Sequence, residues 1–168
     1  MNRSAKSFSK LPTPSIEIGP SDPGYLEATF IACERLAKSH YENFAIGSKM
    51  VPKKLRPHFY SIYAFSRCVD DIGDVAKGDR LALLDLWEKQ LDACYPVATD
   101  PRGPTHPYFI ALARTIQLFN IPADPFKRLI EANRRDQKKT SIKTFDDLLE
   151  YCTYSANPVG HLVLYLCG

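Results

Sequence analysis

The stretch YAFSRCVDDIGD, residues 63–74, places three aspartates and an arginine among apolar side chains. Steps of three and four residues stay on one face of an α-helix, so Asp70 and Asp74 point the same way. Tyr63 and Arg67 fall on the same stripe. Two carboxylates four residues apart repel each other unless a cation lies between them, and Mg²⁺ typically takes one or two carboxylates together with phosphate oxygens. The pattern therefore predicts a helix on which Asp70 and Asp74 hold Mg²⁺, which neutralises a diphosphate leaving group.

Other interpretations of this helix stay open. An isolated pair of aspartates at this spacing is more often a solvated acidic face, by roughly four to one. The acids could instead bind Ca²⁺, or Arg67 could form a structural ion pair with Asp70 or Asp71. In the magnesium interpretation, Arg67 orients a carboxylate or grips a phosphate with two hydrogen bonds. The flanking Ile62 and Phe65 are too apolar for a fully solvated helix, which favours acids that line a cavity.

Apolar residues recur at helical spacing along the rest of the chain, and no alternating strand pattern competes with them. N-caps are expected at Asp22, Asp124 and Thr144. Pro158 and Gly160 are expected to interrupt the last helix. Helices are predicted over residues 24–41, 55–75, 79–94, 108–119, 125–136 and 145–168. The predicted fold class is all-α.

The length of 168 residues fits one domain with a real core. Residues 1–22 are predicted to be a disordered or loosely attached tail, because Pro, Ser and Gly are frequent there. Residues 23–168 are predicted to be one helical domain. The strongly apolar residues 161–168 carry no polar cap, so we expect a chain truncated within its core.

The composition excludes several classes of protein. No stretch approaches the ~20 apolar residues of a membrane span, and the N-terminus lacks the apolar core of a secretory signal. The net charge of +3 is too small to imply a polyanionic partner by itself. Five scattered cysteines without a CxxC pair argue against a disulfide framework or a zinc site. They indicate buried free thiols in a reducing cytoplasm.

Four ordered motifs resemble those of the squalene/phytoene synthase family. The pattern YxxxRxxDDxxD of residues 63–74 resembles the family's first aspartate-rich motif, and HYENF at 40–44 resembles the short motif before it. NRRDQ at 133–137 and YCTYSANPVG at 151–160 resemble the polar segment and the kinked helix that follow. The segments YENF (residues 41–44) and NPVGHLVLY (residues 157–165) are similar to the corresponding segments of the bacterial hydroxysqualene synthases of hopanoid biosynthesis. The resemblance implies a class I isoprenoid synthase-type helical bundle, of which this chain would be the N-terminal part.

The resemblance also implies an activity and the residues that perform it. The implied reaction is the Mg²⁺-dependent conversion of presqualene diphosphate to hydroxysqualene with release of diphosphate; head-to-head condensation of two prenyl diphosphates is the alternative. The implied catalytic residues are Tyr63, Arg67, Asp70, Asp74 and Tyr151. The implied substrate-binding residues are His40, Phe44, Asp136, Val159 and Gly160. The family carries a second aspartate-rich motif on a later helix, and none is found before Gly168.

A basic segment, residues 126–143, offers a competing interpretation. It holds seven basic residues: Lys127, Arg128, Arg134, Arg135, Lys138, Lys139 and Lys143. These charges could form a phosphate-attracting rim, attract an anionic membrane surface, or belong to a solvated loop. A non-catalytic helical module that binds anionic lipid or a partner protein therefore stays open. Otherwise the expected partner is a prenyl diphosphate, in the cytoplasm or at the inner face of the membrane, with no nucleic acid and no obligate protein partner.

Overall fold

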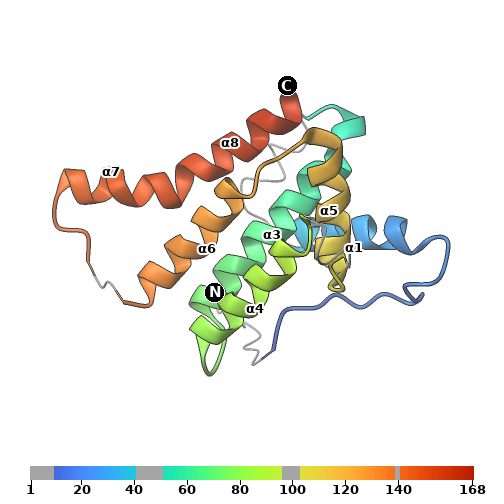
Figure 1. Cartoon of the computed structure of the whole chain (residues 1–168), viewed down its shortest axis with the longest axis horizontal. Helices are drawn as coiled ribbons and strands as arrows, with labels where there is room; N and C mark the ends of the chain where they lie inside the picture. The colour runs from blue at the N-terminus through green and yellow to red at the C-terminus, as the bar shows by residue number, and fades with distance from the viewer. Residues whose placement is uncertain (1–9, 41–50, 96–102, 139–140) are drawn as a thin grey trace.

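The computed structural model describes residues 10–40, 51–95, 103–138 and 141–168, and every regular element in these ranges is helical. This confirms the all-α prediction. The elements, coloured along the chain in Figure 1, are α1 (Tyr25–Ser39), the 3₁₀ helix η1 (Lys53–Leu55), α3 (Arg56–Asp74), α4 (Arg80–Asp92), α5 (Pro107–Phe119), α6 (Asp124–Asp136), α7 (Phe145–Tyr154) and α8 (Ala156–Cys167).

Helix α3 is the centre of the packing and contacts α1, α4, α5, α6 and α8. Four fully buried aromatic side chains hold it in place: Phe65 of α3, Trp87 of α4, Phe109 of α5 and Phe126 of α6. The Phe65 ring centroid lies 5.0 Å from that of Phe126, and the Trp87 and Phe109 centroids are 4.5 Å apart, both pairs edge to face. Such pairs add to the free energy that apolar burial already supplies. The cluster anchors one side of α3 and leaves its aspartate stripe free to face a groove.

Two predicted N-caps are placed differently in the structure. Thr144 is confirmed as the N-cap of α7: its side chain accepts from Asp147 N at 3.1 Å, within a capping box. The N-cap predictions at Asp22 and Asp124 are wrong, because the caps are the residues Gly24 and Ala123. The Asp22 carboxylate accepts from Gly19 N in the preceding turn instead. Asp124 lies inside the first turn of α6, where its carboxylate accepts from Arg128 Nε at 2.8 Å.

The predicted interruption of the last helix occurs earlier than expected. Helix α7 ends at Tyr154 and α8 begins at Ala156, so the break is at Ser155 rather than near Pro158 and Gly160. Proline lacks a backbone N–H and its ring clashes with the carbonyl four residues earlier. In the first turn of α8, Pro158 needs no such donor, and the clash is avoided because the helix restarts. A Cβ at Gly160 would meet no atom within 4 Å, so no close contact requires that glycine.

Part of the N-terminal segment lies against the helices. Leu11 and Ile16 pack on the core, and His106 Nε2, at the start of α5, lies 2.9 Å from the carbonyl oxygen of Pro12. Of the five cysteines, Cys33, Cys68 and Cys94 are confirmed as buried free thiols, whereas Cys152 is half-buried and Cys167 exposed.

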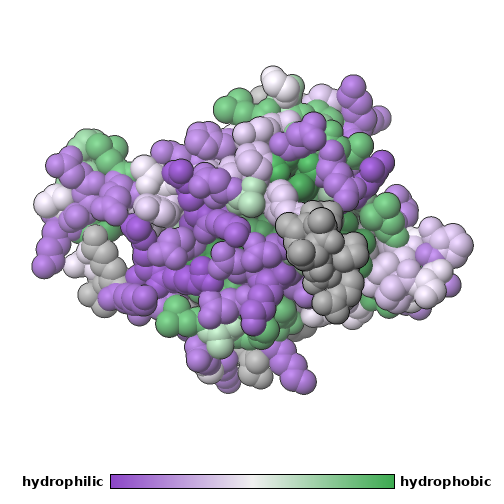
Figure 2. All heavy atoms as spheres, viewed as in Figure 1, coloured by the Kyte–Doolittle hydropathy of each residue, from purple (hydrophilic) through white to green (hydrophobic). Residues whose placement is uncertain are grey.

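Helix α7 is the one α-helix in the described part of the chain that has no buried residue. Figure 1 shows α7 almost in line with α8. Its apolar Phe145, Leu148 and Leu149 are exposed, and Figure 2 shows a hydrophobic patch in that region beside a hydrophilic surface over α4 and α6. Among the described residues, no helix has the length and apolar character needed to cross a membrane.

Candidate active site

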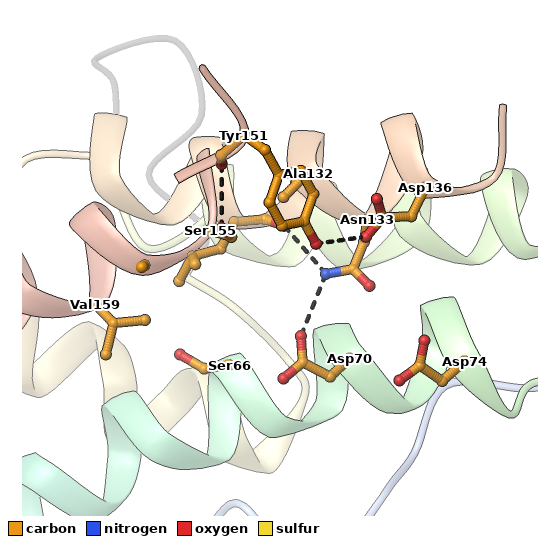
Figure 3. A pocket seen from close by; sticks show the side chains of 11 residues that line it. Ser66, Asp70, Asp74, Ala132, Asn133, Asp136, Tyr151, Ser155 and Val159 are labelled. Atoms are coloured by element: carbon orange, nitrogen blue, oxygen red, sulfur yellow. Dashed lines mark hydrogen bonds between the residues drawn. The ribbon is translucent and has the colours of Figure 1, made fainter. Parts of the chain in front are cut away.

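A groove of about 370 Å³ lies between α3, α6 and the α7–α8 junction. Figure 3 shows acids from two facing helices pointing into it: Asp70 and Asp74 from α3, and Asp136 from α6. Its other lining residues are Ser66, Leu129, Ala132, Asn133, Tyr151, Ser155, Ala156 and Val159. The predicted carboxylate stripe therefore lines an open groove with polar and apolar walls, and both Asp70 and Asp74 are exposed to solvent.

Two hydrogen bonds across the groove fix the acids. Asn133 Nδ2 donates to Asp70 Oδ1 at 3.3 Å and also to the carbonyl of Leu129 at 3.3 Å, so α6 orients the first aspartate of α3. The Tyr151 hydroxyl donates to Asp136 Oδ2 at 2.9 Å, which ties α7 to α6. Figure 3 shows the first bond running between α6 and α3 and the second joining Tyr151 to Asp136.

A close approach of α3 and α6 makes this geometry possible. A Cβ built on Gly73 would overlap the Asn133 amide, with the Asn133 Cγ only 3.0 Å away. Only glycine at this position lets the amide of α6 lie directly against α3 and reach Asp70. Neither Asn133 nor Gly73 was among the predicted site residues. The signal that could have found them was a glycine between two aspartates inside a helix, where glycine costs about 1 kcal/mol relative to alanine.

The groove raises the pKa of two of its groups. Burial and the nearby Asp74 charge together raise the pKa of Asp70 to about 6, although the hydrogen bond from Asn133 and the charge of Arg67 oppose the shift. Solvent reaches the Asp70 carboxylate, but the surrounding helices exclude enough water to disfavour its charge. Burial and the hydrogen bond to Asp136 raise the pKa of Tyr151 to about 12, so its hydroxyl keeps its proton at neutral pH.

The acids fit a hydrated cation that is shared with a diphosphate. Among the residues that the structure describes, no three His, Cys, Asp or Glu side chains lie close enough to hold a metal ion by themselves. Mg²⁺ keeps several waters and commonly uses only one or two protein carboxylates with substrate phosphates, so Asp70 and Asp74 suffice. A bound cation would also relieve the unfavourable charge that raises the pKa of Asp70.

Arg67 lies outside the groove lining. Its Nη2 forms an ion pair with Asp71 Oδ1 at 2.7 Å, one turn along α3. The ion pair with Asp71, one of the interpretations that the sequence left open for Arg67, is present in the structure. Arg67 still lowers the pKa of Asp70 through its charge.

The other predicted site residues divide into three groups. Asp136, Tyr151 and Val159 line the groove together with the aspartates of α3. Tyr63 is buried in the core, His40 Nδ1 lies 3.1 Å from the carbonyl of Leu36 at the end of α1, and Gly160 is exposed on α8. None of these three is part of the groove lining, and Phe44 lies outside the described residues.

Most of the basic segment is engaged in ion pairs within the described residues. Lys127 pairs with Asp92 at 2.8 Å, and Arg134 contacts both Asp85 and Glu88 at 2.6 Å. Arg128 and Arg135 also have acidic partners, and Arg135 stacks on the Tyr154 ring, 3.7 Å from its centroid. These partners neutralise much of the charge that a lipid- or phosphate-binding rim would need.

The pH dependence of stability is expected to report the Asp70 carboxylate. Because its pKa is raised to about 6, this carboxyl group binds its proton more readily in the folded than in the unfolded protein. The charged carboxylate therefore destabilises the folded protein above about pH 6, and this destabilisation decreases as the pH falls toward 4. Metal-free Asp70→Asn protein should be more stable than wild type at pH 7.5, by about 1 kcal/mol after allowance for solvent screening. Thermal melts at pH 7.5 and pH 4.5 check this, and a constant difference between the two proteins would contradict it.

An all-α scaffold with facing acids beside a partly apolar groove is the arrangement that the resemblance to the squalene/phytoene synthases implies. Comparison with known families agrees: the squalene/phytoene synthase family model matches residues 37–168. The chain belongs to the squalene/phytoene synthase family.

Individual relatives place the chain among known synthases. The crystal structure of squalene synthase HpnC from Alicyclobacillus acidocaldarius is 53% identical, with a TM-score of 0.78 over 87% of this chain and 54% of that one. A dehydrosqualene synthase in complex with ligand is 30% identical, with a TM-score of 0.74 over 86% of this chain and 50% of that one. Phytoene synthase from Arthrospira platensis is 28% identical over 148 residues, 87% of this chain and 46% of its own length. The chain thus spans about half the length of these relatives.

Proposed function

We propose that the protein uses Mg²⁺ on Asp70 and Asp74 to ionise a prenyl diphosphate in triterpenoid biosynthesis, with presqualene diphosphate as substrate and hydroxysqualene and diphosphate as products. The observation that carries this proposal is the pair of carboxylates on α3 facing Asn133 and Asp136 of α6 across the groove. The 53% identity to a squalene synthase supports a squalene-type substrate over a carotenoid precursor.

Several residues of the groove have a distinct role in this proposal. Bound Mg²⁺ supplies the positive charge that stabilises the departing diphosphate. Asp70 and Asp74 hold the ion, and Asn133 keeps the Asp70 carboxylate turned toward it. The walls formed by Leu129, Ala132 and Val159 offer an apolar surface to the prenyl chain. One water molecule adds to the rearranged carbocation and loses a proton, which supplies the hydroxyl group of hydroxysqualene.

Tyr151 has a separate role at the opposite wall. With a pKa of about 12 it keeps its proton and donates to Asp136, so the pair holds α7 against α6 beside the groove. When diphosphate is bound, the hydroxyl can instead donate its single proton to a phosphate oxygen in place of Asp136, without adding negative charge. Arg67 acts through the charge that it places near Asp70.

Head-to-head condensation of two prenyl diphosphates is the second candidate, and the names of two relatives support it. One relative is named a phytoene synthase and another a dehydrosqualene synthase, and prenyl diphosphates are the substrate class of the family to which the chain belongs. Both candidates begin by ionising an allylic or cyclopropylcarbinyl diphosphate, so the same acids would serve either reaction. We also propose that the protein acts in the cytoplasm, at the inner face of the membrane where these lipid substrates reside.

Product analysis separates the candidates. The gene product that contains these residues is incubated with Mg²⁺ and either presqualene diphosphate or farnesyl diphosphate, and the extracted lipids are identified by mass spectrometry. The proposal expects hydroxysqualene from presqualene diphosphate and no presqualene diphosphate from farnesyl diphosphate. Condensation products from farnesyl or geranylgeranyl diphosphate would favour the second candidate. Binding to anionic vesicles without turnover and without need of Mg²⁺ would favour a non-catalytic module.

A further inference from the structure

We infer that Arg80 is a positioning residue for the aspartate pair, an inference that rests on the proposed function. Arg80 is the first residue of α4, and its guanidinium reaches back over the end of α3. Its Nη1 donates to the Gly73 carbonyl at 2.8 Å, its Nη2 to that of Asp74 at 3.1 Å, and its Nε to that of Ala76 at 3.0 Å. The last carbonyls of a helix have no backbone N–H partner within the helix. The Arg80 side chain supplies hydrogen-bond donors to such carbonyls at the end of α3.

Gln137 extends this clamp to the end of α6. Its Nε2 donates to the Gly73 carbonyl at 3.1 Å and to the Asn133 carbonyl at 3.2 Å, while its Oε1 accepts from Arg80 Nη1 at 3.3 Å. The Gly73 carbonyl thus accepts from two side chains, one on α4 and one beyond α6. The clamp fixes the ends of the two helices whose acids face each other.

The clamp acts on the metal-binding carboxylates because of where Asp74 lies. Asp74 is the last residue of α3, and terminal turns of helices open more readily than interior turns. Asp70 lies one turn earlier and is held by Asn133. A cation near a helix C-terminus also stabilises the helix dipole, which further opposes opening of the turn. Without the guanidinium, the last turn of α3 would open more often, and the Asp74 carboxylate would lie beside Asp70 for less of the time. The affinity of the two carboxylates for a cation would therefore decrease.

The test measures binding of Mn²⁺, a spectroscopic substitute for Mg²⁺, by electron paramagnetic resonance with and without inorganic pyrophosphate. Arg80→Met in the whole chain should weaken Mn²⁺ binding about tenfold, the lower end of the effect of losing an outer-shell partner. Arg56→Met is the matched control: Arg56 lies at the opposite end of α3, where its Nε donates to the Val51 carbonyl at 3.1 Å. We expect Arg56→Met to lower the melting temperature but to change Mn²⁺ affinity less than twofold.

The outcomes separate this inference from the proposed function. If Asp70→Asn with Asp74→Asn leaves Mn²⁺ binding unchanged, the proposed function fails. If that variant loses binding but Arg80→Met binds Mn²⁺ like wild type, only the positioning role of Arg80 is overturned. Equal weakening by Arg56→Met would show that general stability causes the effect, which also overturns it. If Arg80→Met does not fold, Gln137→Leu, which removes the α6 arm of the clamp, is measured in its place and should weaken binding about threefold.

Discussion

Replacing Asp70 and Asp74 together by asparagine should reduce turnover of a prenyl diphosphate at least about a thousandfold. The change keeps the shape of both side chains but removes the two charges that face the groove. Metal stabilisation of a leaving group contributes several kcal/mol to the transition state, and each 1.36 kcal/mol corresponds to about tenfold in rate. Steady-state assays with Mg²⁺ and presqualene diphosphate measure the loss.

The same variant should be no less stable than wild type, which distinguishes a functional site from a structural one. Burial raises the pKa of Asp70, so its charge destabilises the folded, metal-free protein at neutral pH. Asp92→Asn is the matched control: it removes an exposed surface ion pair with Lys127 and should change both turnover and stability little. Turnover retained within tenfold in the double variant would exclude these carboxylates as the metal site.

Gly73→Ala should lower turnover by about ten- to a hundredfold, although alanine is the better helix former. The new methyl group would occupy the space of the Asn133 amide, which must swing away and give up its hydrogen bonds to Asp70 and to the Leu129 carbonyl. Loss of an outer-shell partner of a ligand commonly costs this much in metal affinity or activity. We expect the free energy of unfolding to fall by about 1 kcal/mol, because two lost hydrogen bonds outweigh the gain in helix propensity.

A double-mutant cycle with Asn133→Ala identifies the cause. The pair Gly73→Ala with Asn133→Ala removes the overlap, so it should be more stable than the sum of the single changes predicts. Turnover should stay low, because Asp70 still lacks its amide partner. A Gly73→Ala protein that is more stable than wild type and fully active would contradict the close approach of α3 and α6.

Local patterns explain why much of the fold could be predicted from the sequence. The stripe that carries Asp70 and Asp74 follows from helical geometry alone, and the capping role of Thr144 follows from the residues beside it. The apolar flanks of the acids predicted a cavity, and in the structure Asp70 and Asp74 line an open groove in which both are exposed.

Contacts between distant segments could not be predicted in the same way. The choice of Arg67 between several acids, the placement of Asn133 against Gly73, and the reach of Arg80 to the end of α3 all depend on how the helices pack. The helix break was predicted too far along the chain, because a proline disrupts the turn before it: the Pro158 ring would clash with the Tyr154 carbonyl in a continuous helix, and the break lies at Ser155.

The most direct measurement is anomalous diffraction from crystals grown with Mn²⁺ and inorganic pyrophosphate. We predict an anomalous peak in the groove within about 2.0–2.2 Å of carboxylate oxygens of Asp70 and Asp74, with pyrophosphate oxygens completing the coordination. A groove that holds neither ion, or Mn²⁺ bound only to acids elsewhere on the surface, would contradict the magnesium-dependent mechanism.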